Sequence, residues 1–164
     1  MFLQREAFYN ENAFVRWYLW AGWNENYQTK TSRYYKRKKN SFIALYYPSN
    51  YEINILNIIN NLKHPKFTLL LPKVQEGNLL KFYEWNIRDV LIVNKFGIPE
   101  PLKNKKSFLP DIVLVPLLAF DNQKNRLGYG KGFYDRYLNN LTILNKKIET
   151  IGIAFSFQKY KKIP

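Results

Sequence analysis

From residue 41 onward, the hydrophobic positions form short apolar runs separated by amphipathic or polar segments. Runs typical of buried strands lie at residues 42–47, 67–71, 79–83, 112–120 and 150–155. Helices are predicted between them, because Ile53, Leu56, Ile59 and Leu62 recur at three-residue spacing and a second periodic segment follows Gly132. Apolar strands that alternate with helices predict one α/β domain, with a twisted, mostly parallel sheet and helices on both faces.

Residues 1–40 have a different character, with many aromatic residues followed by a basic run. The spacing of Phe14, Trp17, Tyr18 and Ala21 predicts a helix. Residues 30–39 carry six basic residues and no acidic one. Such a run is typical of a solvated face, and less often of a nucleic-acid interface. We expect residues 1–40 to form an atypical segment that packs poorly and is open to proteolysis at 27–39, and residues 41–164 to form the domain.

Composition narrows the possible chemistry. The chain has no cysteine and one histidine, which excludes disulfides, a cysteine nucleophile and zinc sites built on these residues. Catalysis must therefore rest on carboxylates, Lys, Arg, Tyr, backbone amides or a hard metal ion. A net charge of +14 favours anionic partners. No apolar stretch is long enough to span a membrane and no leader pattern is present, so we expect a cytoplasmic protein with no membrane partner.

The most informative segment runs from an apolar strand through a basic, glycine-rich loop into a helix. The loop reads Arg126-Leu127-Gly128-Tyr129-Gly130-Lys131-Gly132, and Asp135 follows one turn into the helix. Unpaired N–H groups at a helix start bind anions, and glycines let the backbone approach a ligand closely. The spacing matches neither a P-loop nor the dinucleotide fingerprint. It favours a phosphate-binding site, although a tight strand-to-helix turn would use similar glycines.

The literal string R-L-G-Y-G-K-G-F-Y-D-R, residues 126–136, resembles the signature of the 5-formyltetrahydrofolate cyclo-ligase family, also called 5,10-methenyltetrahydrofolate synthetases. Five further segments resemble that family in the same order: 41–48, 51–54, 71–74, 96–101 and 151–158. The resemblance covers roughly residues 39 to 164. It implies ATP-dependent cyclisation of 5-formyltetrahydrofolate to 5,10-methenyltetrahydrofolate, with release of ADP and phosphate, by a monomer that uses Mg²⁺.

The resemblance also assigns roles to individual residues. Arg126 and Lys131 are the expected catalytic cations, and Asp135 is the expected magnesium ligand. The expected ATP contacts are Arg126, Leu127, Gly128, Tyr129, Gly130, Lys131, Gly132, Phe133 and Tyr134. The expected folate contacts are Glu52, Tyr129, Gly130, Lys131, Gly132 and Phe133. Asp135 and Glu52 have structural alternatives as well, since both fit the first turn of a helix.

Other residues are expected to be mainly structural. Asp121 follows a strand beside an Asn and suits a turn. Glu100, between two prolines in the irregular segment 86–110, is expected to hold structure rather than ligand. Tyr83 and Trp85 are expected in the core, with stacking on folate as the alternative. Gln158 either closes the pocket or is a surface amide, and His64 is expected to be exposed at a helix end.

Both ends depart from the family pattern. Residues 1–40 lack the expected polar helix with a Lys-x-x-x-Arg pair, and the family's late acidic segment and strand are not found before Pro164. We therefore expect a C-terminally truncated domain with an exposed sheet edge beside residues 151–155 and weak catalysis. The alternatives are a degenerate nucleotide- or folate-binding protein without turnover, or a basic nucleic-acid-binding protein.

Overall fold

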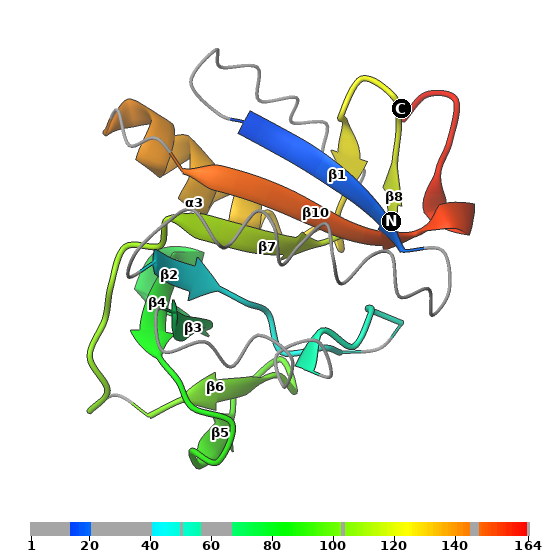
Figure 1. The fold of residues 1–164 in the computed structure, drawn as a ribbon. Helices are drawn as coiled ribbons and strands as arrows, with labels where there is room; N and C mark the ends of the chain where they lie inside the picture. The colour runs from blue at the N-terminus through cyan, green and yellow to red at the C-terminus, as the bar shows by residue number, and fades with distance from the viewer. Residues whose placement is uncertain are drawn as a thin grey trace.

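A computed structural model describes residues 41–49, 51–56, 67–102, 104–144 and 148–163, together with the backbone of 14–20. Its centre is a six-stranded sheet in the order β1-β10-β7-β2-β3-β4 (Figure 1). The bounds are β1 (Phe14–Trp20), β2 (Ser41–Ala44), β3 (Phe67–Val74), β4 (Leu80–Glu84), β7 (Ile112–Pro116) and β10 (Glu149–Phe155). Neighbouring strands are parallel, except that β4 runs antiparallel to β3. The predicted α/β fold with a mostly parallel sheet is confirmed.

The centre of the sheet is buried on both faces. Every residue of β7 is buried, and its side chains alternate between two core clusters. Ile112 and Leu114 belong to the cluster that also contains Ile53 and Trp85. The opposite cluster includes Tyr137 and Leu141 of α3 (Phe133–Ile143), so this helix covers that face. The predicted helix after Gly132 is confirmed.

The apolar run 112–120, predicted as one strand, is divided in two. β7 ends at Pro116, and β8 (Ala119–Phe120) pairs instead with β9 (Arg126–Leu127) in a separate hairpin. Proline has no N–H to donate to a ladder, so the run loses continuity at this point. The Leu118 N–H donates to the Leu127 carbonyl instead (2.8 Å).

The segment 86–110, predicted to be irregular, contains a short antiparallel hairpin. Its strands are β5 (Leu91–Val93) and β6 (Pro99–Pro101). Gly97, with φ of 78°, lies in the turn between them. Short 3-10 turns, η1 (Glu76–Asn78) and η2 (Ser156–Gln158), complete the described elements.

The N-terminal region corrects two predictions. Residues 14–20 form a strand rather than a helix, and this strand lies in the sheet rather than outside the ordered fold. β1 pairs in parallel with β10, from Phe14 opposite Glu149 to Trp20 opposite Phe155. Aromatic and β-branched residues favour strands, and here that preference outweighs the helical spacing. The edge of β10 expected to be exposed is therefore covered, since β10 lies between β1 and β7.

Several expectations fall on residues that the structure does not describe. They concern the basic run 30–39, the proteolytic site at 27–39, His64 and most of the helix predicted at 53–62. Among the described residues, no helix is both long and apolar enough to cross a membrane.

Candidate active site

The glycine-rich loop connects β9 to the start of α3. Gly130 and Gly132 have φ of 84° and 61°, in the left-handed region that glycine adopts readily. Gly132 is the N-cap of α3, and no side chain caps this end of the helix. The first amides of α3 are therefore available to an anion. This arrangement matches the predicted strand, loop and helix start.

Gly128 has a different reason to be glycine. A Cβ at this position would lie 3.0 Å from Nη1 of Arg126. Glycine thus leaves room for the Arg126 guanidinium to fold over the loop. Turn geometry accounts for Gly130 and Gly132, whereas a side chain at Gly128 would press on the Arg126 guanidinium and displace it slightly.

Arg126 and Asp135 form an ion pair across the loop, from Arg126 Nη2 to Asp135 Oδ1. Their side chains are 14% and 22% exposed, so both charges are still within reach of solvent. Arg126 comes from β9 and Asp135 from the first turn of α3. The structure therefore brings together the predicted phosphate-binding cation and the predicted metal ligand.

Glu52 lies in the turn after β2, where the chain folds back on itself. Its Oε2 accepts hydrogen bonds from the Ser49 backbone N–H (2.8 Å) and hydroxyl (3.2 Å). Burial raises the pKa of Glu52, and the Ser49 hydrogen bonds oppose this only in part. The carboxyl ends of β2 and β7 face the same edge of the parallel sheet. The charge of Glu52 acts on Tyr129 and Tyr134, so this turn lies near the loop.

Three tyrosines link Glu52 to the loop electrostatically. Burial, followed by the negative charge of Glu52, raises the pKa of Tyr46 and Tyr134, and raises that of Tyr129 to about 12. For Tyr134, the Arg126 guanidinium partly offsets the rise. All three hydroxyls therefore stay protonated near neutral pH. The predicted residues Glu52, Tyr129, Tyr134 and Arg126 thus form one constellation.

Tyr46 is a member that the sequence did not single out. Its hydroxyl donates to the Ile53 carbonyl (2.8 Å) and so fixes the turn that carries Glu52. Tyr46 is 2% exposed. The only sequence signal was its place at the end of an apolar run, where an aromatic residue is expected in any core.

The family model described as "5-formyltetrahydrofolate cyclo-ligase family" matches residues 12–164. The chain belongs to this family. The match begins well before residue 39, where the resemblance was expected to start, and it includes β1. The family resemblance therefore extends into the N-terminal region that includes β1.

Individual relatives agree. The chain is 36% identical to the 5-formyltetrahydrofolate cyclo-ligase of Haemophilus influenzae over 128 residues, which cover 74% of this chain and 67% of that protein. It is 35% identical to the Mycoplasma genitalium enzyme over 117 residues, 71% of this chain and 60% of that protein. The aligned part thus spans about three fifths to two thirds of these relatives.

Two solved structures share the fold. The 5,10-methenyltetrahydrofolate synthetase of Aquifex aeolicus superimposes with a TM-score of 0.66 at 33% identity, covering 85% of this chain and 70% of that one. The synthetase of Mycoplasma pneumoniae gives a TM-score of 0.61 at 29% identity, covering 84% and 74%.

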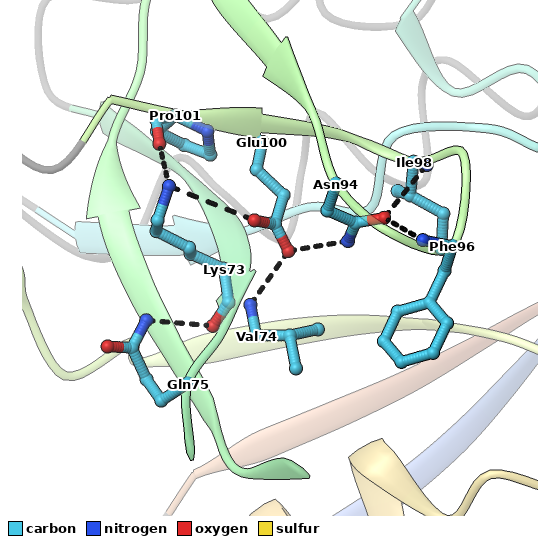
Figure 2. Close-up of polar contacts among 8 residues, drawn as sticks. All are labelled: Lys73, Val74, Gln75, Asn94, Phe96, Ile98, Glu100 and Pro101. Carbon is cyan, nitrogen blue, oxygen red and sulfur yellow. Dashed lines mark hydrogen bonds and ion pairs between the residues drawn. The ribbon is translucent and has the colours of Figure 1, made fainter.

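The structure confirms structural roles for the residues of this cyclo-ligase chain that were expected to have them. Asp121 accepts hydrogen bonds from the Gln123, Asn125 and Ile163 N–H groups and from Asn125 Nδ2. Glu100 is buried among backbone and side-chain donors (Figure 2). Tyr83 and Trp85 are 8% and 3% exposed and lie in the core.

The structure gives Gln158 a structural contact on each end of its amide. Its Nε2 donates to the carbonyls of Leu117 and Leu118 (2.9 and 3.0 Å), and its Oε1 accepts from the Phe155 N–H (2.6 Å). The amide therefore ties the end of β10 to the connection between β7 and β8. It is a structural bridge rather than a free surface amide, and its expected role in closing the pocket stays a prediction.

Proposed function

We propose that this chain catalyses the ATP-dependent conversion of 5-formyltetrahydrofolate to 5,10-methenyltetrahydrofolate, with release of ADP and phosphate. The observation that carries the proposal is the constellation of Glu52 with the glycine-rich loop. The half-buried carboxylate of Glu52, in the turn after β2, lies near the basic, uncapped start of α3, which follows β9. Membership of the cyclo-ligase family supports the same reaction.

The reaction requires activation of a poor leaving group. The formyl oxygen attacks the γ-phosphorus of ATP and ADP leaves, which gives an iminium phosphate. The N10 nitrogen then attacks the former formyl carbon and loses its proton, and phosphate departs with the C–O bonding electrons as the ring closes. The protein must place the γ-phosphate beside the formyl oxygen and neutralise charge. Arg126, Lys131 and the amides of residues 128–132 suit this task.

Glu52 is proposed to hold the folate. A reduced pterin presents adjacent N–H donors, and a carboxylate can accept two of them at once. Ser49 binds one oxygen of Glu52, and Tyr46 fixes the turn behind it, so the carboxylate is oriented before substrate arrives. The neighbouring tyrosines are neutral and do not compete with the carboxylate for the cationic groups of the loop.

Asp135 is proposed to hold Mg²⁺. Among the described residues, no group of three or more acidic or histidine side chains forms a metal cluster. A single carboxylate nevertheless suits Mg²⁺, which is usually held by one or two carboxylates, water and substrate phosphates. When bound, the ion would neutralise charge on the phosphate oxygens. Asp135 would exchange its ion pair with Arg126 for the metal, and Arg126 would turn to a phosphate.

The test is direct. Purified protein is mixed with 5-formyltetrahydrofolate, ATP and Mg²⁺, and the methenyl chromophore is followed by absorbance. We expect product only when ATP is present, with one ADP released per methenyl group. Nucleotide- and folate-induced thermal stabilisation without any product would contradict the proposal, and would identify a binding protein without turnover.

A further inference from the structure

The turn between β5 and β6 is fixed by one side chain, that of Asn94. Its Oδ1 accepts hydrogen bonds from the N–H groups of Phe96 (2.8 Å) and Ile98 (3.1 Å), as Figure 2 shows. The Asn94 backbone also exchanges hydrogen bonds with Gly97 and Ile98 (both 3.0 Å). The backbone of Phe96, Gly97 and Ile98 is therefore held by Asn94, and the Phe96 side chain projects from this fixed backbone.

Asn94 is itself anchored to the core. Its Nδ2 donates to Glu100 Oε1 (2.7 Å), which also accepts from the Val74 N–H (2.8 Å). Glu100 Oε2 lies 3.8 Å from Lys73 Nζ, and Lys73 donates to the Pro101 carbonyl (2.8 Å). Lys73 and Glu100 are each 5% exposed. Breaking such a buried pair is costly, so the turn is held firmly against β3.

Phe96 is the residue of this turn that contacts the glycine-rich loop. The Lys131 ammonium lies 3.7 Å from the centre of the Phe96 ring, and the ring packs against that of Phe133 at 5.5 Å. The Lys131 backbone is held from the other side, because Arg136 Nη2 donates to its carbonyl (2.7 Å). The loop lysine is thus held at both its backbone and its charged end.

We infer that Phe96 is a positioning residue for the phosphate-binding loop, holding the Lys131 ammonium over its ring ready for the nucleotide. This inference rests on the proposed function. Ordering a lysine side chain costs conformational entropy. The cation–π contact with the Phe96 ring offsets this cost before ATP binds. A carboxylate partner would neutralise the charge, whereas a ring face leaves it intact, with N–H groups free for a phosphate.

The kinetic test compares Phe96→Leu with Phe96→Tyr and Phe96→Trp. Leucine keeps an apolar side chain without the ring face, so KM for ATP should rise about two- to fivefold while kcat and KM for the folate stay within twofold. The two aromatic replacements should restore the parent value. Lys95→Met is the matched control, because Lys95 is the other cation on this ring, at 5.2 Å, and lies outside the loop. Unchanged KM for ATP in Phe96→Leu, or an equal rise in Lys95→Met, would overturn the inference.

A second measurement is independent of turnover. Lysine amines are dimethylated with ¹³C-formaldehyde, and the Lys131 signal is assigned by its loss in Lys131→Arg. In the parent it should be shifted upfield by the ring, and in Phe96→Leu it should move to the position of the exposed lysines. A Lys131 signal already at that position in the parent would refute the contact. If the parent makes no methenyl product, the proposed function fails while this spectrum still decides the contact, and ATP affinity replaces KM.

Discussion

The two aspartates on either side of the glycine-rich loop, Asp121 and Asp135, differ in burial and in how many of their acceptor sites are used within the protein. Asp121 is 1% exposed, and both of its oxygens are fully engaged within the turn and with Ile163. Asp135 has a side chain that is 22% exposed and an ion pair to Arg126. Burial would raise the pKa of Asp121, but its many hydrogen bonds outweigh burial and lower it.

The glutamates repeat the contrast. Glu100 is enclosed by Val74, Asn94 and Lys73, while Glu52 has one oxygen bound to Ser49 and a pKa that burial raises. A carboxylate whose acceptor sites are all used within the protein builds the fold. A carboxylate that keeps an unused site near other polar groups is suited to a ligand. The following predictions test this division.

Asp121→Ala should have the largest effect on stability. It leaves the N–H groups of Gln123, Asn125 and Ile163 without their acceptor, which should cost about 2–4 kcal/mol of unfolding free energy. Urea denaturation measures this loss. Asp89→Ala is the control, because it removes an ion pair to Lys105 and a hydrogen bond from the Asn86 N–H, both more exposed to water, and should cost less than about 1 kcal/mol. An equal loss of unfolding free energy in the two variants would contradict the distinction between fully engaged and partly exposed carboxylates.

Arg126→Ala should have the largest effect on function. Loss of a charged hydrogen bond to phosphate, worth about 1.5–3 kcal/mol, should raise KM for ATP about 10- to 100-fold, and KM for the folate much less. Stability should change little, since the lost ion pair is partly exposed. Steady-state kinetics with each substrate varied would measure this, with Arg88→Ala, at an exposed site, as the control. An ATP dependence equal to that of the parent would remove Arg126 from the phosphate site.

Asp135→Asn should act through the metal. In the parent, Mg²⁺ should strengthen nucleotide binding about tenfold or more, and in the variant this enhancement should vanish while the fold persists. Calorimetric titration with ATP, with and without Mg²⁺, measures the ratio. Metal-independent affinity in the parent would show that Asp135 serves only as the partner of Arg126.

Glu52→Gln should give the smallest effect, a change in the pH dependence of stability. Because the folded-state pKa is raised, the native state binds the proton more tightly than the unfolded state. The associated stability is fully present below the unfolded pKa and is lost as pH rises through the folded one. Chemical denaturation across mildly acidic pH should show that, as the pH rises, the unfolding free energy of the parent falls relative to that of Glu52→Gln. A difference that does not change with pH would place Glu52 in an unperturbed environment.

Local signals explain which features could be predicted from sequence. Some features have a sequence signal within a few residues and can be predicted from it. These are the apolar run of β7, the glycines before α3 and the turn at Asp121. Chemistry that depends on distant contacts was not visible in this way. Tyr46 acts through Glu52, and Phe96 reaches Lys131 only after the β5–β6 turn has been anchored. β1 was assigned to a helix because its aromatic spacing imitates one, and only pairing with β10 decides in favour of a strand.

The pairing of β1 with β10 has a consequence for biosynthesis. Phe14 pairs with Glu149, which lies far later in the sequence, so β1 leaves the ribosome long before its partner strand exists. Joining segments so far apart in sequence requires closure of a long loop, which slows folding. A nascent chain must therefore carry an aromatic, strand-forming segment without its partner until residues 149–155 have been made. β1 can therefore join the sheet only after β10, which is made much later, has emerged.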